Sequence, residues 1–300
     1  MDRRSEIRDF LASRRARITP QQAGLPAYGA HRRVPGLRRE EVAMLAGVSD
    51  YYTRLERGNL DGASEGVLEG IAAALQLDEA ERTHLFDLAR TTARTTARPR
   101  RGPGQQRVRP SVQTMLDAMT GAPAVVRNGR LDILATNPLG RALYAPLYRD
   151  PVRPANHARF CFLDPAAHEF WVDWERAAND TVGILRTEAG RTPCDKALSD
   201  LVGELSTRSE DFRTRWAKHN VNLHRTGAKR IHHPVVGRLE LDFEMLHLPA
   251  DPELAMLVYT PQPGTPSADA LQLLASWAAS QNHPDMTPAA EPTPSGSPLL

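Results

Sequence analysis

One run of residues, 37–58, combines side chains that can contact a polyanion with the spacing of two short helices. It reads LRREEVAMLAGVSDYYTRLERG. The small Ala43 lets the two helices cross closely, and Gly47 permits the left-handed backbone of a tight turn. Tyr52 and Leu55 are spaced to face a core. The outward positions of the second helix are then Asp50, Tyr51, Thr53, Arg54 and Arg57. Arginine pairs bidentately with phosphates and guanine edges, so this face has the chemistry to bind nucleic acid.

Two arginines and a serine flank the helices of this segment. Arg38 and Arg39 stand at the start of the first helix, adjacent to the outward face described above. Ser49 follows the turn, where its hydroxyl would cap the second helix. Solvation is the alternative for the two arginines, and we expect at least one of them to contact phosphate.

The outward arginines also have alternative partners within the protein. Arg54 and Arg57 could pair with Glu56 or Asp61, and of the two arginines we expect Arg54 to contact DNA. Tyr51 fits a DNA contact and an ordinary surface tyrosine equally well. A helical hairpin without DNA binding is the alternative for the whole segment, but the turn glycine, the small alanine and the ERG ending together favour a helix-turn-helix.

Periodic apolar positions predict five helices over residues 1–93, hence an all-α domain. Ser64 and Asp78 stand at the expected N-caps of the fourth and fifth helices. Residues 94–110 are rich in Arg, Pro and Gly and cannot pack a core, which predicts a linker. An arm that follows the DNA backbone is the alternative for this stretch.

Residues 111–283 mix strand and helix patterns and predict a second, α+β domain. The Asn128-Gly129 pair between two apolar runs is typical of a β-hairpin. Further expected elements are a long amphipathic helix over 166–190, an alternating strand from Leu239 to Met245, a central strand LAMLVYT and a helix over 267–280 ending at Trp277. Pro and small residues dominate the remainder, so 284–300 is expected to be a disordered tail.

Charge is distributed unevenly along the 300 residues. Residues 1–110 hold 20 of the 38 basic residues and 14 of the 36 acidic ones, so they are net basic and the remainder is net acidic. This asymmetry indicates contact with a polyanion through one end. The preference for Arg over Lys has genomic base composition as its simpler explanation. Two cysteines and the lack of any apolar run near 20 residues predict a cytoplasmic protein without a membrane partner.

No motif supports a metal site or an enzyme. His232 and His233 are neighbours, and on a strand their side chains would point to opposite faces and could not easily share an ion. Cys161 lies between two phenylalanines and is typical of a buried small hydrophobe. Walker, GxSxG, GxGxxG and HExxH patterns are absent from the sequence. We therefore expect no cofactor, no metal and no enzymatic activity.

The strings LRREEVA, AGVS and RLERG resemble the Xre-type, lambda-repressor-like helix-turn-helix, in which Glu56 and Gly58 match the acidic residue and glycine that end the recognition helix. The run LPAYGAHRRVPGLRREEVA, together with AVVRNGRLDILATNPLGRALY, DLVGELSTRS and HHPVVGRLEL, is similar to actinobacterial regulators with an MmyB-like ligand-binding domain. The similarity covers about residues 1–280. It implies a PAS-like sensory fold and a bound lipophilic effector, with fatty acids the expected class. One departure is that Asp50 follows Ser49 directly, where family members have one more residue.

Candidate walls for a ligand cavity come from two expected elements. Trp171 and Trp174 are three residues apart on the expected long helix, and Leu239, Leu241 and Phe243 share one face of the alternating strand. The residues alone favour core packing, and the resemblance raises a ligand cavity to an equal alternative. The candidate anchors for a charged head group are Arg130, Arg141, His224 and Lys229.

These observations predict a transcriptional regulator that binds double-stranded DNA sequence-specifically under the control of a lipophilic small molecule. A single recognition helix covers few base pairs, so we expect a homodimer, paired through the C-terminal domain. Because the linker is flexible, coupling between the domains is expected through dimer geometry rather than a rigid connection. The alternatives are a protein-interaction module whose helix-turn-helix has lost DNA binding, and an enzyme with a sensor-like fold, which the missing motifs disfavour.

Overall fold

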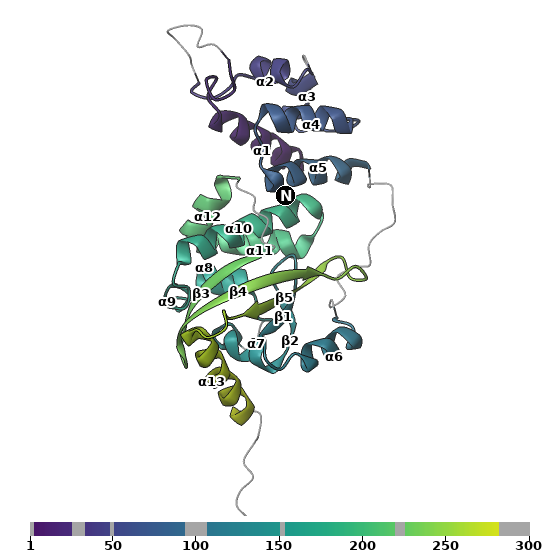
Figure 1. The fold of residues 1–300 in the computed structure, drawn as a ribbon. Helices are drawn as coiled ribbons and strands as arrows, with labels where there is room; N and C mark the ends of the chain where they lie inside the picture. The colour runs from purple at the N-terminus through teal and green to yellow at the C-terminus, as the bar shows by residue number, and fades with distance from the viewer. Residues whose placement is uncertain are drawn as a thin grey trace, which may run out of the picture.

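The computed structural model describes residues 3–25, 34–48, 51–93, 107–150, 154–219 and 226–281. Their N-terminal part is helical, as expected for an all-α region (Figure 1). Its helices are α1 (Arg3–Arg17), α2 (Arg39–Leu45), α3 (Tyr51–Glu56), α4 (Glu65–Ala74) and α5 (Glu79–Ala93). Most of the linker expected at 94–110 lies outside the described residues, and so does the expected tail at 284–300.

Local capping explains where the later helices of this region begin. Ser64 Oγ accepts a hydrogen bond from the Val67 backbone N–H at 3.3 Å, at the start of α4. Asp78 and Glu81 form a reciprocal pair at the start of α5, because each side chain accepts from the other residue's backbone N–H, at 2.8 and 3.2 Å. Both N-caps predicted from the sequence are thus confirmed.

The C-terminal part is an α+β domain, which confirms the predicted layout. Its five-stranded antiparallel sheet has the order β2-β1-β5-β4-β3. The strands are β1 (Ala124–Asn128), β2 (Ile133–Thr136), β3 (Thr226–His233), β4 (Gly237–His247) and β5 (Leu254–Thr260). The helices are α6 (Pro110–Ala118), α7 (Pro138–Leu143), the 3-10 turn η1 (Ala145–Tyr148), α8 (His157–Leu163), α9 (Ala167–Phe170), α10 (Trp174–Arg191), α11 (Lys196–Arg208), α12 (Glu210–Ala217) and α13 (Pro266–Gln281).

The sheet follows the sequence pattern closely. β5 is the central strand, as its continuous apolar run predicted, and β4 buries Leu239, Leu241 and Phe243 while Glu240 and Glu244 are exposed. β1 and β2 pair as the predicted hairpin. The loop between them spans residues 129–132, because Asn128 Oδ1 accepts from the Asp132 N–H at 3.0 Å and holds the loop open wider than a two-residue turn.

The prediction of a single long helix over 166–190 is wrong, because the structure has two helices there, α9 and α10. The chain leaves α9 at Trp171, which forms an isolated β-bridge with Ile231, and the Val172 N–H donates to the Arg230 carbonyl at 3.2 Å. Asp173 then caps α10 by accepting from the Arg176 N–H at 3.2 Å. Pairing with β3 thus interrupts the helix, and Trp171 and Trp174 do not share a helix face. At the C-terminal end, α13 continues beyond the expected end at Trp277.

The two regions touch directly, whereas the flexible linker led us to expect coupling through dimer geometry rather than a rigid connection. Figure 1 shows α8, α10 and α11 between the sheet and the N-terminal helices, with α1 and α5 above α10. The Arg186 guanidinium of α10 donates to Glu6 Oε1 of α1 at 2.6 Å, and both side chains are buried. Burial makes this contact important, because Arg186 and Glu6 are both shielded from water and neutralise each other across the boundary.

Candidate functional site

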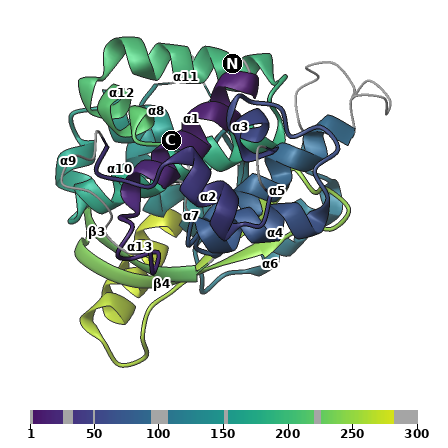
Figure 2. The same ribbon diagram turned by 90° about the horizontal axis from the view of Figure 1, so that it is seen from above.

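The helix-turn-helix is built around α2, α3 and the turn between them. Gly47 has φ +67°, the left-handed backbone that its place in the sequence predicted, and the Val48 N–H donates to the Ala43 carbonyl at 2.9 Å. Tyr52 and Leu55 are fully buried, as predicted. Figures 1 and 2 show α2 and α3 on the side of the molecule that faces away from the sheet.

Glu56, at the end of α3, is 1% exposed and ties the recognition helix to its neighbours. Its carboxylate accepts from Arg15 of α1 at 2.8 and 3.0 Å and from Arg39 of α2 at 3.1 Å. Burial opposes its ionisation, but the hydrogen bonds and charges of Arg15 and Arg39 outweigh burial and hold the pKa of Glu56 below its ordinary value. The alternative in which Arg54 or Arg57 pairs with Glu56 is therefore wrong.

The structure explains why the motif ends with a glycine at position 58. Its φ is +94°, and a Cβ atom there would lie 2.4 Å from the carbonyl oxygen of Arg4. The backbone of α1 thus sits directly on the end of the recognition helix, and a larger side chain would push the two apart.

The predicted DNA-contacting side chains occupy the outer face as far as they are described. Arg54 and Arg57 are exposed, while Tyr51 and Thr53 are half-buried. The Arg54 guanidinium lies 5.3 Å from the centre of the Tyr51 ring and donates to the Asp61 carbonyl at 3.1 Å, so it is held over the surface of α3. Arg38 is exposed, and Arg39 is half exposed although its Nε bonds Glu56. Ser49 and Asp50 lie outside the described residues, so their roles stay predictions.

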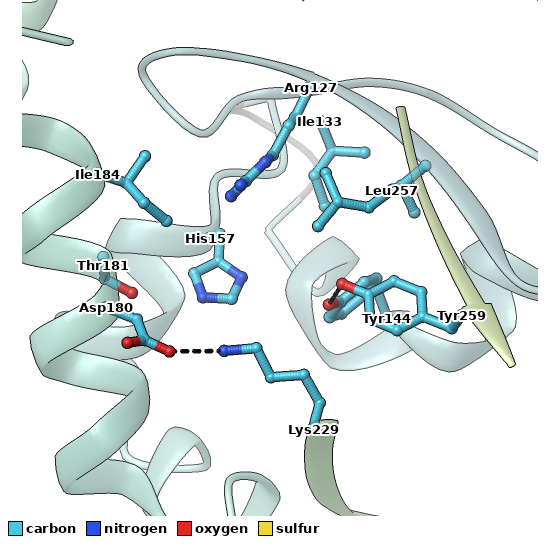
Figure 3. A pocket seen from close by; sticks show the side chains of 11 residues that line it. Arg127, Ile133, Tyr144, His157, Asp180, Thr181, Ile184, Lys229, Leu257 and Tyr259 are labelled. Carbon is cyan, nitrogen blue, oxygen red and sulfur yellow. Dashed lines mark hydrogen bonds and ion pairs between the residues drawn. The ribbon is translucent and has the colours of Figure 1, made fainter. Parts of the chain in front are cut away.

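A narrow pocket lies in the C-terminal domain between the sheet and α10 (Figure 3). Asp180, Thr181 and Ile184 project into it from α10. The opposite wall and the ends consist of Val125, Arg127, Ile133, Tyr144, His157, Lys229, Leu257 and Tyr259. In this structure the pocket has room for little more than a water-sized sphere. A larger ligand must therefore displace some of these side chains.

The polar groups of the pocket are unusually buried. Lys229 Nζ pairs with Asp180 at 3.0 Å, and burial lowers the pKa of Lys229 despite the opposing charge of Asp180. The hydroxyls of Tyr144 and Tyr259 share a hydrogen bond at 2.5 Å. Burial also lowers the pKa of His157 to about 3, so this ring is neutral at physiological pH.

Arg127 is the unusual member of this set. Its side chain is buried, and Nη2 makes a weak hydrogen bond to Met245 Sδ at 3.9 Å. No carboxylate within the described ranges pairs with its guanidinium, and burial lowers its pKa. An unpaired buried cation is strongly unfavourable, and an anion entering the pocket would compensate for it. Sequence reasoning missed Arg127, although an arginine inside the apolar run AVVRN was a signal.

The five side chains predicted as ligand walls do not line this pocket. Leu239, Leu241, Phe243 and Trp171 are buried in the adjoining core, and the half-buried Trp174 stacks on His168 at 4.1 Å. Trp171 does line a second, shallower hollow beside Lys229. The cavity expected between the two tryptophans and the β4 stripe is thus filled by core packing, and contact of these five with a ligand stays a prediction.

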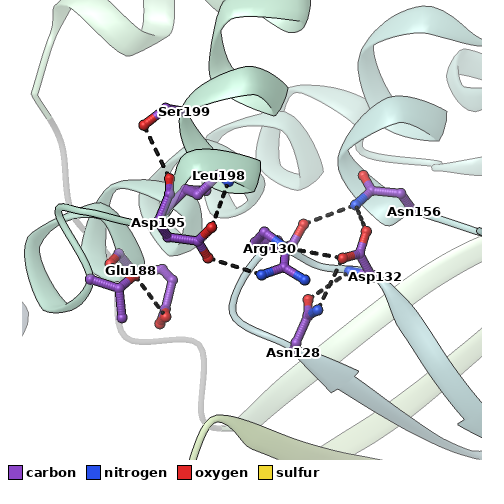
Figure 4. A network of polar contacts seen from close by, with 9 residues as sticks. Asn128, Arg130, Asp132, Asn156, Glu188, Asp195, Leu198 and Ser199 are labelled. Atoms are coloured by element: carbon purple, nitrogen blue, oxygen red, sulfur yellow. Dashed lines mark hydrogen bonds and ion pairs between the residues drawn. The ribbon is translucent and has the colours of Figure 1, made fainter. Parts of the chain in front are cut away.

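Of the four candidate head-group anchors, Lys229 lines the pocket. Arg141 lies over the Tyr148 ring at 4.3 Å on the surface, and His224 lies outside the described residues. Arg130 belongs to a polar network, in which it pairs with Asp195 at 2.9 Å and Asp132 at 3.2 Å (Figure 4). This network fastens the hairpin loop to α11, which explains the position of Arg130 without a ligand.

A metal site and a membrane-spanning helix each have requirements against which the described residues can be compared. Across these ranges, no group of three His, Cys, Asp or Glu side chains is placed to hold a metal ion. His232 is exposed and His233 buried, on opposite faces of β3 as predicted. Among the described helices, none combines the length and apolar character that crossing a membrane would require.

A helix-turn-helix with an exposed basic face, followed by an α+β domain with a polar pocket, defines a ligand-binding transcription regulator. Two family models agree with this class. Residues 6–85 match a helix-turn-helix domain, and residues 108–274 match the MmyB-like transcription regulator ligand binding domain. The chain belongs to the MmyB-like transcription regulators, as the sequence motifs indicated. No curated protein matches the chain.

Proposed function

We propose that this regulator binds specific operator DNA through α3 and that its C-terminal pocket takes a lipophilic carboxylate, such as a fatty acid. The observation that carries the ligand class is Arg127, a buried guanidinium that faces the pocket without a carboxylate partner in the described residues. A carboxylate head group would pair with Arg127 bidentately. The acyl chain would extend along Ile133, Ile184 and Leu257, which supply the apolar part of the lining.

The energetics favour such a ligand despite the narrow pocket. Each methylene group removed from water contributes about 0.8 kcal/mol, so a long chain offsets the entropy of binding and the repacking of the pocket. We propose further that the protein pairs as a homodimer, because two recognition helices cover two half-sites.

The ligand is tested by calorimetric titration with palmitate of the full-length protein from which bound lipid has been removed. The parent is expected to bind in the micromolar range, and Arg127→Met is expected to weaken binding by about tenfold or more, since a charge-assisted hydrogen bond contributes roughly 1.5–3 kcal/mol. Arg141→Met is the matched control, because Arg141 is a surface arginine of the same domain. Equal affinities of the two variants would contradict the assignment of Arg127.

DNA binding is tested by a gel shift on the duplex upstream of the protein's own coding sequence. A retarded band that weakens steeply with salt supports an operator-binding protein. A protein-interaction module without DNA binding would give no shift at any salt concentration.

A further inference from the structure

Helix α10 serves both the pocket and the contact between the two regions. Asp180, Thr181 and Ile184 line the pocket from one stretch of the helix. Arg186 and Gly190, further along the same helix, meet the N-terminal helices. A rigid helix that contacts both places moves at one when it is displaced at the other.

The contact of α10 with α1 centres on Arg186, which is fully buried. Its Nη1 donates to Glu6 Oε1 at 2.6 Å and lies 2.9 Å from His219 Nδ1. Its guanidinium lies over the Trp216 ring at 3.9 Å and also donates to the Trp216 carbonyl. Glu6 is itself 5% exposed. Neither charge can return to water without separating the two helices, so the pair fastens α10 to α1.

Close packing adds a second constraint at the same boundary. A Cβ atom on Gly190 would lie 2.5 Å from Cε1 of the His84 ring, so the ring of α5 rests on the backbone of α10. The His84 ring in turn packs edge-on against Phe10 of α1 at 4.9 Å between centres. Interfaces packed this tightly respond to displacement by switching arrangement rather than by gradual deformation.

The opposite side of α1 holds the recognition helix. Arg15 pairs with Glu56 of α3, and the Arg4 carbonyl fills the space beside Gly58. Glu6 and Arg15 thus connect one helix, α1, to α10 at one end and to α3 at the other. The path from the pocket to the DNA-reading face consists of two helices and two ion pairs, whose carboxylates Glu6 and Glu56 are both buried.

We propose that α10 and α1 transmit occupancy of the pocket to the recognition helix, with the Glu6–Arg186 pair as the joint between them. This inference rests on the proposed function of the pocket. Because the pocket is narrow, a ligand displaces the side chains of α10, and the displacement reaches α3 through α1. The two binding sites are then linked thermodynamically, so that each ligand changes the affinity for the other by the same factor.

The first experiment needs neither ligand nor DNA. Amide hydrogen exchange is measured on the full-length parent, Glu6→Gln, Arg186→Met and the double variant. Both single variants are expected to exchange faster in α1 and α3, by about tenfold. In the double variant, the decrease in the free energy of exchange should be smaller than the sum of the decreases in the two single variants, because both remove the same ion pair. Arg159→Met is the matched control, because it breaks the Arg159–Glu204 pair at 2.9 Å within the C-terminal domain. Unchanged exchange in α3 of Glu6→Gln, which keeps the shape of the side chain, would overturn the proposal.

The second experiment measures the anisotropy of the labelled upstream duplex with and without palmitate. In the parent and in Arg159→Met, palmitate is expected to change the DNA dissociation constant by roughly 5–150-fold. In Glu6→Gln the change should fall below about twofold while palmitate affinity is kept. If palmitate binds to Glu6→Gln and changes its DNA affinity by the same factor as in the parent, the Glu6–Arg186 joint is refuted and the ligand assignment stands. If palmitate does not bind, the ligand assignment fails and the exchange measurement alone decides the joint.

Discussion

Glu56 of the recognition helix accepts two hydrogen bonds from Arg15 of α1, at 2.8 and 3.0 Å, although 41 residues separate them. The acidic residue of the ERG ending thus fixes the angle between α3 and the rest of its domain. It does not face DNA, because the carboxylate is 1% exposed.

Removing this carboxylate is expected to destabilise the protein strongly. Glu56→Ala should lower the free energy of unfolding by about 3–5 kcal/mol, because it leaves the Arg15 charge poorly compensated. Glu69→Ala is the control, since Glu69 forms an exposed pair with Arg82 and its loss should change the free energy of unfolding little. Urea unfolding at pH 7 measures both. An equal decrease in the free energy of unfolding in both variants would contradict a larger stabilising contribution from Glu56 than from the exposed pair.

The boundary between the regions is expected to weaken in acid. Burial, with the charges of Arg186 and Arg14, lowers the pKa of His84 to about 3, below the value near 6.5 of an unfolded histidine. The unfolded chain therefore takes up a proton that the folded protein refuses. The stabilisation is complete above pH 6.5 and declines as pH falls toward 3, by up to about 1.4 kcal/mol per pH unit for one such group.

Replacing the titrating group isolates this contribution. The unfolding free energy of His84→Leu should fall less steeply between pH 6 and pH 4 than that of the parent. The difference in slope should correspond to about one proton fewer taken up on unfolding. A parental slope in His84→Leu would mean that His84 is protonated in the folded state.

Arg54 is expected to read a base, and Arg38 to contact phosphate. Arg54→Ala should lose about 1–3 kcal/mol of binding free energy and relax preference at one base pair. Arg38→Ala should weaken all sequences alike and reduce the slope of log affinity against log salt by roughly 0.9. Selection from random duplexes separates the two effects. Recovery of the same sequence motif by Arg54→Ala and the parent would exclude Arg54 as a reader.

The oligomeric state is checked by analytical ultracentrifugation. We expect two copies on an operator whose half-sites are about one helical turn apart. A monomer both free and on operator DNA would rule out the dimer.

The helix-turn-helix could be predicted almost completely from the sequence, because its determinants are local. Gly47 sets the turn, and Tyr52 and Leu55 follow helical spacing. The partner of Glu56 could not be predicted, since Arg15 lies in another helix and no spacing rule connects the two. The exposed positions of Arg54 and Arg57 followed from the helix face alone.

In the C-terminal domain the strands followed from alternation, but the site did not. The amphipathic pattern over 166–190 gave no sign that Trp171 would pair with Ile231 and end the helix. An apolar stripe such as Leu239 to Phe243 has the same sequence pattern whether it fills a core or lines a cavity, so the pattern could not distinguish the two. Arg127 shows the complementary case: its type was visible in β1, but its lack of a carboxylate partner among the described residues is a property of the fold.

The most direct test of a pocket for a lipophilic carboxylate is mass spectrometry of lipids extracted from the purified protein. The parent and Arg141→Met are predicted to yield the same carboxylate-bearing lipid in similar amounts, and Arg127→Met to yield at least several-fold less of it. No such lipid in the parent, or an equal amount in Arg127→Met, would contradict the account.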